Sequence, residues 1–329
     1  MALIEVRDLV KEYVLTTKKT GLRGSLQSLF FPDKRRVHGV DGISFDIESG
    51  EIVGYIGPNG AGKSTTIKML TGILHPTSGT IRINGISPQK DRKAVVSQLG
   101  VVFGQRTQLY WDLRLGESFE LLKRIYRIDD ETFRMNLNTM ADVLGIDKLV
   151  DTPVRQLSLG QRMKGDLAAA VLHSPSILFL DEPTIGLDVE SKHAVRDFIR
   201  EINRQRGTTV VLTTHDLDDV EQLCERLIVV SGGKVVEDGP LRTIVGRLAP
   251  FRVLELQLER AAANLQHSKA EILRQDGLRV SYRFDRNLVT AAELIADLSQ
   301  RLPIQDLKVK EPDIEDAIRE LYRGNVAYG

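Results

Sequence analysis

The stretch GPNGAGKST, residues 57–65, constrains the fold most strongly because it matches the P-loop pattern, with Gly57, Gly62, Lys63 and Ser64 in register. Glycines let the backbone bend until successive N–H groups point at phosphate oxygens. An apolar run, IVGYI, precedes the stretch, and a helical pattern, KSTTIKMLTGIL, follows it. A strand, a glycine-rich turn and a helix in this order predict a phosphate-binding site.

Beyond this loop, short β-rich runs alternate with helical patterns from about residue 40 to about residue 245. The runs ILFL and VVLT are almost entirely apolar, which is typical of strands that are covered on both faces. Strands that alternate with helices predict an α/β fold with a largely parallel sheet. Between Arg106 and His173 the alternation stops and helical patterns dominate, which predicts a helical subdomain inserted into the α/β core.

The pattern changes again after Pro250. RVLELQLER, LRVSYRF and IQDLKVKE are predicted to be strands, whereas LQHSKAEILRQ, TAAELIADLSQRL and PDIEDAIRELY are predicted to be helices. This order predicts a small α+β domain. We therefore expect a first domain over residues 1–247, with its helical subdomain at about 106–173, and an accessory domain over residues 248–329.

The composition of the chain excludes several classes of function. The 45 lysines and arginines balance 45 aspartates and glutamates, so the formal net charge is +0 and we expect no nucleic-acid partner. The single cysteine rules out an intramolecular disulfide and fits a reducing compartment. The N-terminus MALIEVRDLVKEY does not resemble a signal peptide, and no apolar run is long enough to span a bilayer. Action at a membrane would therefore require a partner that crosses it.

A second chemical element, SILFLDEPT, leads an apolar strand into two carboxylates. A carboxylate at the end of a strand beside a P-loop can hold Mg²⁺, directly or through water, and Asp181 has this position. The next carboxylate, Glu182, can orient or deprotonate an attacking water. Within the loop, Lys63 would reach the β- and γ-phosphates of a nucleotide, and Ser64 would ligate Mg²⁺.

A third element, LSLGQRMKGDLAAAVL, begins at Leu157. Ser158 can cap a helix that Gly160 starts, and the AAAVL stretch propagates the helix. The N-terminus of this helix is a further anion site. Alone, the pattern indicates only a capped helix; it gains meaning because it lies a short distance before the strand that ends at Asp181.

Together these elements resemble the ATP-binding cassette (ABC) ATPase family over about residues 3–245. GPNGAGKST resembles its Walker A motif, ILFLDE its Walker B motif and LSLGQ its signature. Gln105 in VVFGQ resembles the Q-loop glutamine, Asp188 in GLD the D-loop aspartate, and His215 in TTHD the switch histidine. Tyr13 in KEY resembles the aromatic residue that stacks on adenine.

The resemblance implies an ATP site with Mg²⁺, in a cassette that combines a parallel-sheet core, an antiparallel β-subdomain and a helical subdomain. It implies catalytic roles for Glu182, for His215 and for Gln105, and it makes Ser64, Gln105 and Asp181 the metal ligands. The residues that it places at the nucleotide are Tyr13, Gly57, Pro58, Asn59, Gly60, Ala61, Gly62, Lys63, Ser64, Thr65, Asp181, Ser158, Gly160, Gln161 and Asp188.

The family mechanism requires two cassettes that close head to tail around two ATP molecules. Each site joins the P-loop of one chain to the LSLGQ helix of the other, so the resemblance implies a second ATPase chain, either another copy of this chain or a related cassette. The sequence departs from the family at Leu159, where glycine is usual. Because Ser158 and Gly160 remain, we expect a working site.

The segments VVFGQRTQLYWDL, DTPVRQLSLGQR, DEPTIGLD and EPDIEDAIRELY resemble the bacterial exporter subgroup whose permeases are separate six-helix chains. This resemblance implies an exporter-type ATPase on the cytoplasmic face of the cell membrane, with a transmembrane permease as partner. The alternative is an ABC ATPase that energises a cytosolic assembly or regulatory complex without a permease. For residues 248–329 we prefer a domain that stabilises the dimer to a domain that senses a ligand.

Two further features of the sequence each have two interpretations. Tyr110 and Trp111 either pack in the core of the helical subdomain or form a socket for a helix of the permease. The insert at about residues 16–36 has Leu22, Leu26 and Leu29 at helical spacing between basic ends. Its residues 18–36 either form an amphipathic helix that contacts a membrane surface or the permease, or belong to an elongated hairpin that packs on its own subdomain.

Overall fold

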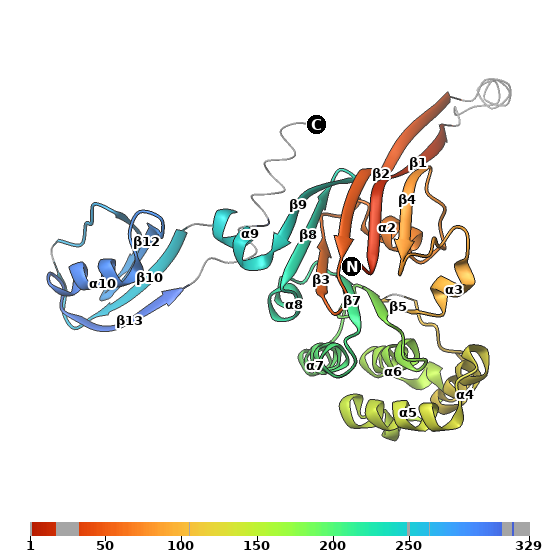
Figure 1. Ribbon diagram of the computed structural model, residues 1–329. Coiled ribbons are helices and arrows are strands. Elements are labelled where there is room, and N and C mark those ends of the chain that lie inside the picture. The colour runs from red at the N-terminus through yellow and green to blue at the C-terminus, as the bar shows by residue number, and fades with distance from the viewer. Residues whose placement is uncertain are drawn as a thin grey trace, which may run out of the picture. The chain divides into compact units, whose positions relative to one another are not determined.

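The computed structural model describes residues 2–17, 33–104, 106–248, 251–262, 264–310 and 318 (Figure 1). The chain divides into two compact units, Met1–Pro240 and Leu241–Gly329. The domain boundary at 247/248 that the sequence predicts stays a prediction. Among the described residues, none of the helices has the length and apolar character needed to cross a membrane.

A six-stranded sheet forms the centre of the first unit, with strand order β5-β6-β7-β3-β8-β9. Its strands are β3 (Ile52–Ile56), β5 (Leu99–Phe103), β6 (Ile177–Asp181), β7 (Thr209–Thr213), β8 (Arg226–Ser231) and β9 (Lys234–Pro240). The first five strands in this order pair in parallel, and only β9 is antiparallel to its neighbour. All five residues of β7 are buried, which confirms the interpretation of VVLT as a strand that is covered on both faces.

Parallel pairing places the carboxyl ends of β3, β5, β6 and β7 at one edge of the sheet. The segments that follow these strands begin at Gly57, Gly104, Glu182 and Thr214. These are the segments that carry the sequence motifs, so the topology alone brings the motifs to a common edge.

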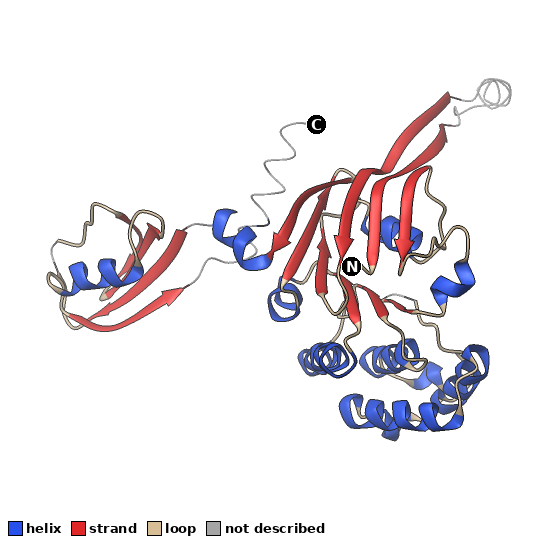
Figure 2. Ribbon diagram, in the orientation of Figure 1, coloured by secondary structure: helices blue, strands red, loops and turns tan. Residues whose placement is uncertain are grey.

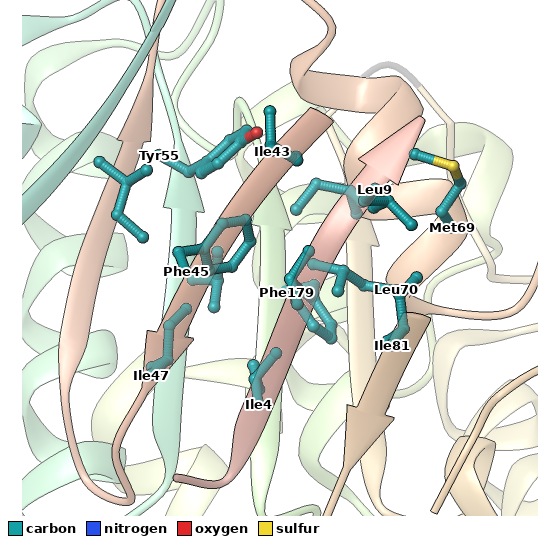
Figure 3. Close-up of a cluster of buried hydrophobic side chains, with 14 of the residues drawn as sticks. Ile4, Leu9, Ile43, Phe45, Ile47, Tyr55, Met69, Leu70, Ile81 and Phe179 are labelled. Atoms are coloured by element: carbon teal, nitrogen blue, oxygen red, sulfur yellow. The ribbon is translucent and has the colours of Figure 1, made fainter. Parts of the chain in front are cut away.

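A second, antiparallel sheet of three strands has the order β2-β1-β4, with β1 (Ile4–Thr17), β2 (Asp33–Ile47) and β4 (Ser78–Ile83). Side chains from this sheet pack with side chains of the six-stranded sheet and of the helix α2 (Lys63–Leu70) in one apolar cluster. Figure 3 shows Ile4, Phe45 and Ile81 of the small sheet close to Phe179 of β6. This shared core fixes the β-subdomain, and Tyr13 on it, relative to the loop that precedes α2.

Strands β1 and β2 remain paired as far as Thr17 and Asp33. Residues 16, 17 and 33–36 of the predicted insert therefore belong to the hairpin, as the elongated-hairpin alternative expects. The predicted amphipathic helix with Leu22, Leu26 and Leu29 lies outside the described residues.

Helices occupy the segment between β5 and β6, and other helices precede β5 or follow β6 and β7 (Figure 2). The bounds are α3 (Arg92–Val96), α4 (Leu115–Tyr126), α5 (Asp130–Leu144), α6 (Leu159–Val171), α7 (Val189–Arg206) and α8 (Leu217–Leu223), with short 3₁₀ turns at Ile146–Leu149 and Val154–Gln156. A buried amide links the helical subdomain to the core, because Asn136 Oδ1 of α5 accepts from Arg206 of α7 at 2.7 Å. The α/β fold with an antiparallel β-subdomain and a helical subdomain is thus confirmed.

The second unit contains α9 (Leu241–Leu248) and a four-stranded antiparallel sheet of order β11-β12-β10-β13. The remaining bounds are β10 (Phe251–Leu258), β11 (Ala270–Asp276), β12 (Arg279–Asp285), α10 (Ala291–Ser299) and β13 (Ile304–Lys310). Alternate residues of β10 and β12, among them Leu254 and Tyr282, face a buried cluster shared with Leu294 and Leu298 of α10. This is the small α+β domain that the sequence predicts.

One predicted element of this unit is wrong. The sequence LQHSKAEILRQ predicts a helix, but its second half forms strand β11, which pairs antiparallel with β12. The turn between the strands uses Gly277 with φ 59°, a left-handed conformation that glycine adopts without steric cost. Because β11 is an edge strand with mostly exposed side chains, it lacks the alternation that identifies a half-buried strand. The predicted final helix, PDIEDAIRELY, lies outside the described residues apart from Ile318.

Candidate active site

The glycine-rich loop after β3 follows a path that two of its glycines make possible. A Cβ atom at Gly57 would lie 2.2 Å from the carbonyl oxygen of Val230, and one at Gly62 would lie 2.3 Å from that of Gly39. Gly62 also has φ 102°, which side chains rarely tolerate. The loop is therefore held between β8 and β2, and it leads into α2 at Lys63, whose first turn has no side-chain cap.

The Lys63 side chain lies inside this loop. Its Nζ donates hydrogen bonds to the carbonyl oxygens of Gly57 at 2.7 Å and Pro58 at 3.3 Å. Burial lowers the pKa of the Lys63 ammonium, and the negative charges of Glu182 and Asp181 partly oppose that shift. A cation in this position can exchange the two carbonyl oxygens for phosphate oxygens without crossing bulk solvent.

Ser64 and Asp181, which the sequence predicts to ligate Mg²⁺, are in direct contact. Ser64 Oγ donates to Asp181 Oδ2 at 3.0 Å, and the hydroxyl of Thr213 at the end of β7 donates to Oδ1 of the same carboxylate. Among the described residues there is no group of three or more His, Cys, Asp or Glu that could enclose a metal. One carboxylate beside a hydroxyl suits Mg²⁺, which commonly takes its other ligands from phosphates and water.

Glu182 has a left-handed backbone conformation, with φ 55°. Its N–H donates to the carbonyl oxygen of Thr213 at 2.8 Å, and its own carbonyl lies so close to Gly104 that a Cβ there would be 2.2 Å away. His215 Nδ1 lies 3.5 Å from Glu182 Oε1, and the imidazole is 60% exposed. Two of the three predicted catalytic side chains therefore meet at the same edge of the sheet, with the histidine facing solvent.

A buried polar network that the sequence does not predict supports both of these loops. Arg196 of α7 donates from Nε to Asp219 Oδ1 at 2.6 Å, and both residues are buried. The hydroxyl of Thr184, two residues after Glu182, also donates to Asp219. The hydroxyl of Thr214, the residue before the switch histidine, lies 3.4 Å from the same carboxylate. An arginine on the apolar face of an amphipathic helix is the one sequence signal that could have indicated this network.

Four other predicted residues, Ser158, Gly160, Gln161 and Asp188, form a second group at the starts of α6 and α7. Ser158 caps α6, because its Oγ accepts from the Gln161 N–H at 3.2 Å, while Gln161 Oε1 accepts from the Ser158 N–H. A Cβ at Gly160 would lie 2.3 Å from Ser191 Oγ. Asp188 caps α7 and accepts from the N–H and hydroxyl of Ser191, which lowers the pKa of the Asp188 carboxyl. Among the described residues, no hydrogen bond or ion pair joins this group to the loop that holds Lys63.

An open pocket lies beside the P-loop. Its lining residues are Ser64, Lys68, Ile73, Phe103, Gly104, Arg106, Asp181 and Glu182. Gln105 lies outside the described residues, but its neighbours on both sides, Gly104 and Arg106, line this pocket.

Three aromatic side chains that the sequence singles out are exposed. Tyr13 lies across Gly39 of β2, where a Cβ would come within 2.7 Å of its ring, and the ring is partly open to solvent. Tyr110 and Trp111 are 47% and 51% exposed, so the interpretation that they pack in the core is wrong. The Arg162 guanidinium lies 5.6 Å from the Trp111 ring, which leaves an exposed aromatic surface at the start of the helical subdomain.

Comparison with known proteins places this geometry among ATP-binding cassettes. The family described as ABC transporter matches residues 40–185. The chain is 33% identical over 215 residues to the ABC transporter ATP-binding protein NatA of Bacillus subtilis, covering 65% of this chain and 87% of NatA. It is 35% identical over 217 residues to the Nod factor export ATP-binding protein I of Burkholderia pseudomallei, covering 66% of this chain and 71% of that protein.

The fold is also similar to a solved cassette. A dimeric ATP-binding cassette in a post-hydrolysis state, bound to ADP and Pi, superimposes with a TM-score of 0.60 at 25% sequence identity. The similarity covers 73% of this chain and 99% of the cassette.

Proposed function

Because this chain belongs to the ABC transporter family and is an ATPase subunit of that family, we propose that it drives export through a separate transmembrane permease. The observation that carries the proposal is the meeting of Lys63, Ser64, Asp181, Glu182 and His215 at one edge of the parallel sheet. These side chains supply a phosphate-binding cation, a hard-cation site, a carboxylate for water and a polar contact for the γ-phosphate.

Each side chain then has one task in the reaction. Lys63 holds the β- and γ-phosphates of ATP, and Tyr13 stacks on the adenine. Ser64 and Asp181, with Gln105, would hold Mg²⁺, which supplies charge neutralisation at the phosphates when it is bound. Glu182 orients the attacking water and takes its proton, and His215 contacts the γ-phosphate. The network around Asp219 keeps the last two side chains at the sheet edge.

We infer that the complete site requires a second ATPase chain. The cap group around Ser158 and Asp188 shares no hydrogen bond or ion pair with the P-loop group among the described residues. A helix N-terminus that makes no hydrogen bond to its own P-loop can still complete the P-loop site of a partner. The dimeric cassette with ADP and Pi supports this arrangement. Dimer closure on ATP and opening after hydrolysis would move the permease.

Three observations support export with a separate permease. The relative from Burkholderia pseudomallei is named for Nod factor export. The helices of the described residues are each too short or too polar to span a membrane, which is compatible with a permease on another chain. The exposed Tyr110 and Trp111 offer an aromatic surface for a permease helix, on the cytoplasmic face of the membrane.

The proposal is tested with two site variants and one control. Lys63→Ala is expected to abolish ATP hydrolysis, and Glu182→Gln to trap an ATP-bound dimer in gel filtration. Lys93→Ala, which removes an exposed lysine from α3, serves as the control and is expected to keep wild-type turnover. Unchanged hydrolysis in Lys63→Ala would refute the site. Purification from cells with a soluble partner only, and none of the chain in membrane fractions, would refute the transport role.

A further inference from the structure

A buried carboxylate in the middle of α6 is not used by the proposed reaction. Asp166 is 4% exposed. Its Oδ1 accepts hydrogen bonds from the Thr107 hydroxyl at 2.9 Å and from the Gln108 N–H at 3.0 Å. The Gln108 side chain in turn donates to the backbone carbonyl of Asp166 at 2.9 Å. Three hydrogen bonds therefore attach α6 to the segment that begins two residues after Gln105.

The attachment is reinforced by close packing next to the carboxylate. Thr107 Oγ1 also accepts from the Leu109 N–H at 3.1 Å, which fixes the turn of the attached segment. A Cβ at Gly165 would lie 3.0 Å from Leu109 Cδ1 and 2.9 Å from Leu115 Cδ1. Leu109 is itself buried. The segment 107–109 therefore contacts α6 in two ways, through apolar packing at Gly165 and through hydrogen bonds to Asp166.

A buried carboxylate is an expensive way to stabilise a fold, because burial removes its hydration. Burial raises the pKa of the Asp166 carboxyl to about 6, although the hydrogen bonds from Gln108 and Thr107 oppose that shift. An apolar side chain at this position would pack without that cost. What the carboxylate adds is geometry, since one acceptor atom holds two donors of a loop at fixed positions.

The two parts joined by Asp166 lead to different halves of the proposed nucleotide sites. In one direction, the chain runs back from Thr107 to Arg106 and Gly104, the two sequence neighbours of Gln105, which line the pocket beside their own P-loop. In the other, α6 runs back to Ser158, which lies eight residues earlier, or about 12 Å along a helix. Helices are rigid over this distance, so a displacement at one end is carried to the other.

We propose that Asp166 is a positioning residue that makes the Q-loop segment and the signature helix move as one body. The proposal rests on the proposed function, because it takes the nucleotide roles of Gln105 and Ser158 from there. In this proposal, the contact of Gln105 with one nucleotide determines the position at which Ser158 meets the second nucleotide. Asp166 touches neither nucleotide and acts only through the segment 107–109 and α6.

The test compares ATP turnover of four variants of the full chain. Asp166→Ala removes the acceptor and is expected to lower kcat about tenfold with KM for ATP changed less than about twofold, the scale of one lost charged hydrogen bond. Thr107→Val removes one donor and is expected to lower kcat about threefold. The double variant is expected to match Asp166→Ala, because the two residues act through one contact. Asp166→Asn retains an acceptor at Oδ1 and is expected to keep at least about half of kcat.

Two controls separate positioning from a loss of stability. Asn136→Ala removes another buried polar side chain of the helical subdomain, and Thr139→Val makes the threonine change on the exposed side of α5. Both are expected to keep wild-type kcat, even where Asn136→Ala lowers the thermal midpoint as much as Asp166→Ala does. Should Asp166→Ala fail to fold, Thr107→Val with Gln108→Leu removes two of the three bonds from the loop side.

Three outcomes would overturn the proposal: unchanged kcat in Asp166→Ala, additive effects in the double variant, or an equal loss of kcat in Asn136→Ala. Lys63→Ala distinguishes this failure from failure of the proposed function. If Lys63→Ala is inactive while Asp166→Ala is normal, only the positioning role is wrong. If Lys63→Ala is itself active, the assignment of the site is wrong.

Discussion

Replacing Arg196 with methionine is expected to destabilise the first unit and to slow ATP hydrolysis. Methionine fills part of the volume of the arginine stem, but it leaves the Asp219 carboxylate buried without the guanidinium that now lies 2.6 Å from it. Asp219 is fully buried, so water cannot replace that partner. Because Asp219 also accepts from Thr184 and Thr214, a carboxylate without its guanidinium holds the loops that follow β6 and β7 less firmly.

The size of the effect follows from the burial of the pair. Removing one partner of a buried ion pair costs about 3–5 kcal/mol, because the remaining charge is left uncompensated. For a unit of this size, that loss corresponds to a fall of roughly 10 °C in the thermal midpoint. The double variant Arg196→Met with Asp219→Leu removes both charges and is expected to recover about half of the stability or more. It is not expected to recover turnover, since replacing Asp219 takes away the acceptor of the Thr184 and Thr214 hydroxyls.

The chain offers a specific probe and a matched control for this measurement. Trp111 is the single tryptophan, so its fluorescence during urea denaturation reports the first unit alone. Arg200→Met, on the same helix, breaks an exposed ion pair with Asp197 and exposed hydrogen bonds to Gln222, and it is expected to change stability by less than about 0.5 kcal/mol. The reasoning would be refuted if Arg196→Met lowered the free energy of unfolding by less than about 1 kcal/mol. It would also be refuted if the double variant were less stable than Arg196→Met alone.

Two further predictions concern buried ionisable groups. Burial raises the pKa of Asp166 from 3.8 to about 6, so the unfolded chain ionises first and stability falls as pH rises from about 4 to 6. Urea titrations at pH 4 and 7 should show Asp166→Asn gaining about 2 kcal/mol on wild type between these two pH values. An equal difference between the two proteins at both pH values would contradict the prediction. Burial also raises the pKa of the Cys224 thiol to about 12. A thiol reagent at pH 8 should therefore label the native protein far more slowly than the denatured protein. Rapid labelling of the native protein would show that the thiol is accessible.

The sequence predicts the central fold well because parallel strands that are covered on both faces must be apolar. The runs ILFL and VVLT therefore predict the strands β6 and β7 from the sequence alone. The strand order β5-β6-β7-β3-β8-β9 could not be predicted from these runs, since each of them would fit any interior position. Strand β11 was missed for the opposite reason: an edge strand keeps polar side chains on both faces and loses its period.

Motif residues could be predicted because their spacing is local, whereas their supports could not. The P-loop and the pair Asp181–Glu182 are each contiguous in sequence, and the parallel sheet brings them to one edge. Asp166 and Thr107 are 59 residues apart, and Arg196 and Asp219 are 23 apart. No periodicity links such partners, and a charged residue in a helix is ordinarily expected at the surface. Their roles emerge only when burial and contacts are known.

Leu159 shows how a structure can change the meaning of a departure from a family pattern. The cap of α6 uses the Ser158 hydroxyl and the Gln161 side chain, so it does not depend on the side chain between them. The neighbouring Gly160 has no such freedom, because a Cβ there would come within 2.3 Å of Ser191 Oγ. A leucine methyl group instead lies over Gly186, where a Cβ would be 3.2 Å away. Glycine at 186 thus provides the space that leucine at 159 needs, and the cap geometry that the proposed function requires is retained. Since Leu159 is 38% exposed, its remaining effect is an apolar contact surface at the start of α6, where a second chain would approach.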